Sequence, residues 1–154
     1  MSRNEKSVIK IIGNNIEDLK IISTYIQDSL VTVGDIVFLK KNRIFIMLIN
    51  RFMWENVKKH SKDLKKRIRC AIKFEGIFNV KSKNINQSTK NKSLEFLAIK
   101  CNYTSDENYN INFFFSGGGA ITLISESIEV IMQDIGKPWI VKHAPKHKIW
   151  MLIY

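Results

Sequence analysis

The chain has 154 residues, 45% of them hydrophobic, and 25 Lys and Arg against 14 Asp and Glu give it a formal net charge of +11. This length is typical of one domain, expected over residues 1–154, and it supports a core without disulfides or a structural metal, which excludes a disordered or fibrous protein. The longest apolar run, Ile44 to Ile49, is far shorter than the roughly 20 residues that a membrane span needs, so no membrane span is predicted.

The first predicted element is an amphipathic helix from Ile16 to Leu30. Asn15 precedes it as a suitable N-cap, and apolar residues then recur at helical spacing, namely Leu19, Ile22, Ile26 and Leu30.

Two β-branched, continuously apolar runs follow at residues 36–39 and 44–49. The four polar residues between them predict a hairpin. Because apolarity is continuous rather than alternating, both strands are expected to be covered on both faces and to lie centrally.

The clearest periodic pattern lies between Arg67 and Lys81, where apolar and polar residues alternate over fifteen positions. A helix cannot present that pattern to one core, so the segment is predicted to be a strand. Its length predicts a bend or bulge at Gly76. The outer face would then carry a row of cations, Arg67, Arg69, Lys73 and Lys81.

The polar stretch 82–93 predicts a surface loop, followed by a strand over 94–103. Strands over 111–115 and 120–124 flank Gly117, Gly118 and Gly119, which predict a hairpin turn with positive φ. An anion-binding nest at the same glycines is the alternative.

A second helix is predicted near the C-terminus. One face would carry Ile128, Ile131, Met132 and Ile135, and Gly136 with Pro138 would end it. In the tail, residues 137–154, the segment Ile149–Tyr154 is wholly apolar. It must either dock on the core of its own chain or contact a protein partner or a second copy.

These elements predict an α+β domain with a mainly antiparallel, strongly bent sheet or partly closed barrel of about six strands, plus one N-terminal and one C-terminal helix. A pleckstrin-homology-like arrangement is an analogue by element order alone.

Positive charge is concentrated between residues 57 and 92, where there are twelve basic residues and only two acidic ones. Such a segment predicts an anionic partner, and nucleic acid is the first candidate. The chain is also rich in Lys, Ile and Asn, whose codons are rich in A and T, so a merely soluble basic face is the alternative. The candidate nucleic-acid site comprises Lys58, Lys59, Lys62, Lys65, Lys66, Arg67, Arg69, Lys73 and Lys81.

The string from Asn50 to Glu55 places two aromatic residues directly before this basic segment. Arg51 and Glu55 can pair, and Phe52 with Trp54 can form a partner surface or a stacking platform for single-stranded nucleic acid. Alternatively, the two aromatic residues close the end of the sheet as part of the core.

Reactive or ligand-binding motifs are not evident. His143 and His147 are four residues apart, but Pro145 between them breaks the helix that a zinc site of that spacing needs. Cys70 and Cys101 form no CxxC motif and sit in predicted strands, which favours reduced thiols in a cytoplasmic protein. We therefore predict no catalytic residue, no metal and no cofactor. An enzyme would instead show a pocket converging on Asp28, Asp35, Arg51, Glu55 or the Gly117 turn.

Several strings occur in an order that resembles a family of small alphaproteobacterial proteins of unknown function: Val33-Gly34-Asp35, Asn50-Arg51-Phe52 with Trp54-Glu55, Leu97-Ala98-Ile99, Phe115 to Ile121, Asp134-Ile135-Gly136 and Pro138-Trp139. The resemblance spans roughly residues 9–139 and implies a bacterial cytosolic protein. It implies no activity or catalytic residue, and the tail after Lys142 departs from the pattern.

Three functions follow from these patterns. The first is a non-enzymatic binding or adaptor module that presents a protein-contacting surface. The second is a nucleic-acid- or ribosome-associated protein that uses the 57–92 segment. The third is an enzyme with an unfamiliar site.

Overall fold

The computed structural model describes residues 8–56 and 65–145. Within these ranges the chain forms one α-helix, α1 (Ile16–Ile26), and three 3-10 turns, η2 (Lys40–Asn42), η3 (Trp54–Asn56) and η4 (Ser116–Gly118). It also forms nine strands: β1 (Lys10–Gly13), β2 (Leu30–Leu39), β3 (Ile44–Phe52), β4 (Lys66–Glu75), β5 (Ile77–Lys83), β6 (Ser93–Tyr103), β7 (Tyr109–Phe115), β8 (Ala120–Ser125) and β9 (Val130–Ile140).

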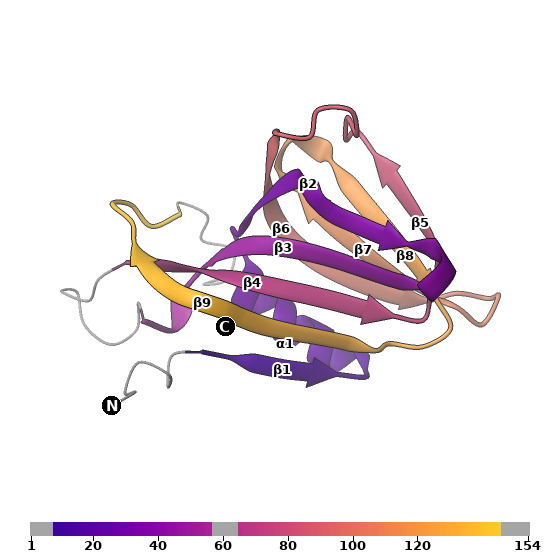
Figure 1. The fold of residues 1–154 in the computed structure, drawn as a ribbon. Coiled ribbons are helices and arrows are strands. Elements are labelled where there is room, and N and C mark those ends of the chain that lie inside the picture. Colours follow the sequence, from indigo (N-terminus) through magenta and orange to yellow (C-terminus); the bar gives the residue numbers. More distant parts are fainter. Residues whose placement is uncertain (1–7, 57–64, 146–154) are drawn as a thin grey trace.

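The strands form one antiparallel sheet in the order β1-β9-β4-β3-β2-β6-β7-β8-β5, with β1 and β5 at its edges. We call β1, β9, β4, β3 and β2 the first half, and β6, β7, β8 and β5 the second half. The halves are joined where Leu30–Thr32 of β2 pairs with Ser93–Glu95 of β6. The sheet bends there, so both halves contribute to one apolar core (Figure 1).

The helix begins as predicted but ends earlier. The Asn15 side chain caps it by accepting a hydrogen bond from the Asp18 backbone N–H at 2.8 Å. Three of the predicted apolar positions, Leu19, Ile22 and Ile26, are buried. The predicted end at Leu30 is wrong, because Asp28 adopts a positive φ of 61° and Leu30 already belongs to β2.

The predicted strands after the helix are confirmed, and the 67–81 segment is divided at Gly76. The expectation that the strand over residues 36–39 is covered on both faces is wrong, because Val37 and Leu39 are exposed on one face of β2. β4 buries its even positions from Ile68 to Phe74, as the alternation predicts. Gly76 has a φ of 75°, which favours glycine, and it separates β4 from β5. β5 then leaves the first half and pairs with β8 at the far edge of the sheet.

The predicted fold class is wrong in both its strand count and its second helix. The chain is mostly β, with nine strands in an open sheet and one helix in the described residues, so the pleckstrin-homology-like analogue, which needs a C-terminal helix, fails. Residues 130–140 form β9, which lies between β1 and β4. Gly136, predicted to stop a helix, instead adopts a φ of 77° where the β9 register shifts.

A cluster of aromatic rings forms the centre of the core. Phe113 of β7 lies 6.0 Å from Phe45 of β3 and 5.5 Å from Phe74 of β4, measured between ring centroids. These contacts join the two halves of the sheet. In the part of the chain that is described, no helix is long and apolar enough to cross a membrane.

Candidate functional site

A buried ionic cluster centres on Arg51 of β3. Its guanidinium donates two hydrogen bonds to Asp134 of β9, both at 2.7 Å, and two to Glu55, at 2.9 and 2.7 Å. The side chains of Arg51 and Asp134 are 0% exposed. Arg51 also lies over the Tyr25 ring of α1, 5.7 Å from its centroid. The cluster therefore connects β3, β9, η3 and the helix.

The electrostatics of this cluster indicate a structural role. Burial alone would lower the pKa of Arg51, but its hydrogen bonds to Asp134 and Glu55 and the negative charges of both outweigh that effect and raise the pKa above its usual value. A permanently charged guanidinium that engages both carboxylates in bidentate pairs fixes them as hydrogen-bond acceptors.

The aromatic residues of the Asn50–Glu55 string close one end of the sheet. Phe52 is fully buried, and its ring meets the Trp54 ring edge-on at 4.6 Å. The Trp54 indole N–H donates to the Gln27 carbonyl oxygen at 2.8 Å. The core interpretation of Phe52 is therefore confirmed, while Trp54 and Glu55 stay partly exposed.

The predicted row of cations is not continuous. Arg67, Arg69 and Lys73 share the outer face of β4, whereas Lys81 lies on β5 across the sheet. The row is wrong as a geometric prediction because the chain changes direction at Gly76.

The cations on β4 already have partners. Arg67 donates to the carbonyl oxygens of Asp28 and Asn50, and burial lowers its pKa, an effect that the charges of Asp28 and Glu95 partly offset. Arg69 pairs with Asp35 at 3.1 Å, and Lys73 with Glu75 at 3.4 Å.

Lys65 is exposed and Lys66 half-buried, while Lys58, Lys59 and Lys62 lie outside the described residues. The apolar segment Ile149–Tyr154, predicted to contact the core or a partner, also lies outside them.

The glycine string forms a hairpin turn between β7 and β8, as predicted. Gly117 and Gly118 have φ values of 83° and 84°, and the Phe115 backbone N–H donates to the Gly119 carbonyl oxygen. The Gly118 carbonyl oxygen accepts from the Asn84 side chain at 3.2 Å. An anion nest at this turn stays a prediction.

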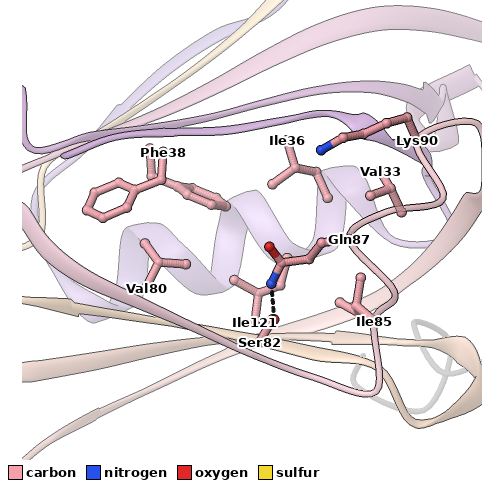
Figure 2. A pocket seen from close by; sticks show the side chains of 10 residues that line it. Val33, Ile36, Phe38, Val80, Ser82, Ile85, Gln87, Lys90 and Ile121 are labelled. Atoms are coloured by element: carbon pink, nitrogen blue, oxygen red, sulfur yellow. Dashed lines mark hydrogen bonds between the residues drawn. The ribbon is translucent and has the colours of Figure 1, made fainter.

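A cavity of about 230 Å³ lies between the two halves of the sheet (Figure 2). Its walls come from β2, β3, β5 and β8, and one side is covered by residues 84–92, which we call the strap. Most lining side chains are apolar, and the polar ones come from β5 and the strap. The lining residues are Val33, Ile36, Phe38, Phe45, Val80, Ser82, Ile85, Gln87, Lys90 and Ile121.

Two glycine-containing strings hold the strap in place. The backbone N–H groups of Val33 and Gly34 donate to the carbonyl oxygens of Lys92 and Lys90, both at 2.9 Å. A Cβ on Gly34 would lie 3.1 Å from that Lys90 oxygen, a tight contact, so glycine favours this close approach of the two backbones. At the other end of the strap, a Cβ on Gly119 would come within 3.2 Å of Ile85. The Val33-Gly34 and Gly117–Gly119 strings therefore position one loop over one cavity.

The cavity does not coincide with the residues predicted for an enzyme. Asp28, Asp35, Arg51, Glu55 and Gly117 are all absent from its lining. Burial raises the pKa of the Cys101 thiol to about 11 and raises that of Cys70 further, so both thiols are poor nucleophiles at neutral pH. Within residues 8–56 and 65–145, no group of three His, Cys, Asp or Glu side chains could hold a metal ion.

Fold and cavity together define a mostly β protein in which one bent, open sheet encloses a small hollow under a loop. No curated protein matches the chain. The family described as a protein of unknown function, DUF2948, matches residues 9–147, and the chain belongs to this family.

Proposed function

We propose that this protein is a non-enzymatic binding module that holds a small, largely apolar molecule in the cavity under the strap. The observation that carries the proposal is the cavity itself, lined by apolar side chains from both halves of the sheet and covered by a loop that two glycine strings position. Apolar walls with a few converging polar groups are typical of ligand sites.

The cavity volume limits the ligand. An apolar protein cavity of roughly 150 Å³ stays dry and binds benzene. At about 230 Å³, this cavity scales to a ligand of roughly nine or ten non-hydrogen atoms. Among the polar lining groups, the Gln87 amide donates a hydrogen bond to the Ser82 hydroxyl oxygen at 2.9 Å.

Filling the cavity is expected to abolish binding. In Val80→Phe the larger ring occupies the cavity, whereas in Val37→Phe the same change lies on the exposed outer face of β2. We expect 1-octanol, titrated while amide NMR shifts are followed, to bind the wild type and Val37→Phe alike and Val80→Phe at least tenfold more weakly. Equal binding to all three proteins, or to none, would contradict the proposed site.

A protein-contacting module is the second candidate, and the outer face of the first half favours it. Large apolar side chains are exposed there, namely Ile12 (69%), Val37 (42%), Leu39 (43%) and Ile135 (40%). Two cations on this face are paired with carboxylates, Arg69 with Asp35 and Lys73 with Glu75. Because the whole chain carries +11, an apolar face on which two cations are already paired is where a second copy can approach with less repulsion. The partner that we propose for this face is therefore a second copy.

Sedimentation equilibrium tests this contact. Val37→Lys places a charge within the face, while Phe114→Lys does so at a similarly exposed residue (38%) on the second half. We expect the wild type and Phe114→Lys to self-associate and Val37→Lys to do so at least tenfold more weakly. A wild type that stays monomeric at millimolar concentration would exclude this candidate.

A further inference from the structure

We propose that the ligand of the cavity is an amphipathic anion, a short acyl chain that ends in a carboxylate, with the carboxylate at Lys90. This inference rests on the proposed function, because it assigns a chemical class to the molecule in the same cavity.

The lining of the cavity combines apolar side chains with a few polar groups from β5 and the strap. Phe38, Phe45 and Ile121 form an apolar wall of ring and aliphatic carbon, on which a hydrocarbon chain loses water-exposed surface. The polar lining groups are the Ser82 hydroxyl, the Gln87 amide and the Lys90 ammonium, and Figure 2 shows the Lys90 side chain extending over the cavity toward Ile36. A ligand that matches both kinds of lining group has an apolar body and a polar end.

The polar groups offer hydrogen-bond donors to that end. The Gln87 amide nitrogen uses one N–H on the Ser82 hydroxyl at 2.9 Å, and a primary amide nitrogen has a second N–H to donate. Within the described residues, Lys90 forms none of the ion pairs with Asp or Glu. An ammonium and an amide N–H that face the same hollow match a carboxylate, which accepts several hydrogen bonds and forms the stronger, charge-assisted type with lysine.

The strap fixes the Lys90 backbone but leaves its side chain free to reach a ligand. The Lys90 carbonyl oxygen accepts a hydrogen bond from the Gly34 N–H, and a Cβ on Gly34 would lie only 3.1 Å from that oxygen. The side chain therefore starts from a defined point above the cavity. Lys90 is exposed, so water solvates its ammonium in the empty cavity. An anionic end group gains a charge-assisted hydrogen bond there that an uncharged end group does not, and on this ground the site favours anions.

Comparison of octanoate with 1-octanol tests the inference, because the two share an eight-carbon chain and have about ten non-hydrogen atoms, the size that the cavity sets. The wild type is expected to bind octanoate at least tenfold more tightly than 1-octanol. Lys90→Gln is expected to abolish that advantage while 1-octanol binding stays unchanged. Lys92→Gln is the matched control, since Lys92 lies on the same strap and is exposed like Lys90 but does not line the cavity.

The outcomes separate the two proposals. If 1-octanol binds as tightly as octanoate, the anionic class is overturned and the proposed function stands. If neither binds, or if Val80→Phe binds octanoate as tightly as the wild type, both are overturned. If Lys92→Gln weakens octanoate as much as Lys90→Gln, the preference arises from the overall positive charge, and the assignment to Lys90 is overturned.

Discussion

Asp134→Ala is expected to lower the free energy of unfolding by about 3–5 kcal/mol, because it leaves the fully buried guanidinium of Arg51 without its main counter-charge. Two hydrogen bonds of 2.7 Å to Arg51 disappear with the carboxylate. The Ile9 backbone N–H also loses its acceptor, at 3.1 Å, and this contact helps to hold the edge strand β1 against β9.

Urea denaturation followed by tryptophan fluorescence measures this loss. Gln133→Ala is the control, because Gln133 is the preceding residue of β9 and its side chain is exposed. The double replacement Arg51→Met with Asp134→Leu is expected to recover most of the stability, since well-packed apolar side chains substitute for a buried ion pair at little cost. A loss below about 1 kcal/mol in Asp134→Ala would show that water reaches Arg51 and that the cluster does not hold the strands together.

The strands of the hairpins could be predicted because their signal is local. In β4 the alternation of buried and outward residues follows directly from the alternation of apolar and polar residues in the sequence. Gly76 ends the strand, because its φ of 75° favours glycine. The Gly117–Gly119 turn could be predicted for the same reason, because Gly117 and Gly118 have positive φ values that favour glycine. Such features depend on neighbouring residues and need no knowledge of the partner strand.

The strand β9 could not be predicted in this way, because its apolar residues fit both the spacing of a helix and the alternation of a strand. Ile128, Ile131 and Ile135 recur at helical spacing, while Val130, Met132 and Asp134 alternate as inward residues of a strand. Contacts distant in sequence decide between them, above all the pair of Asp134 with Arg51, 83 residues away. A helix would lose the ladders with both β1 and β4.

The candidate site was even less accessible to sequence reasoning. Val33, Val80 and Ile121 are ordinary strand residues, and only the bend of the sheet brings them around one hollow. Gly34 stood out in the sequence as part of a string, but its role depends on the Lys90 oxygen 3.1 Å from where its Cβ would be. Likewise, alternation placed Arg69 outward, whereas its pairing with Asp35 depends on how β2, β3 and β4 lie together.

Phe113→Ala is expected to destabilise the protein by about 3–5 kcal/mol, because it opens a void at the centre of the core. Phe113 is fully buried on β7, and its ring contacts Phe45 and Phe74 of the first half and, at 6.2 Å, Phe96 of the second. Among the strands that the structure describes, the two halves share a ladder only at the short β2–β6 joint, so these ring contacts carry much of the packing between them.

The same denaturation experiment, with two comparison variants, tests this role. Phe113→Leu keeps most of the buried volume and is expected to cost clearly less than Phe113→Ala, since the loss grows with the size of the remaining void. Phe114→Ala removes the neighbouring, partly exposed ring and is expected to cost less still, because little core packing is lost. If Phe113→Ala and Phe114→Ala cost the same, the two halves must be held together by contacts other than this aromatic cluster.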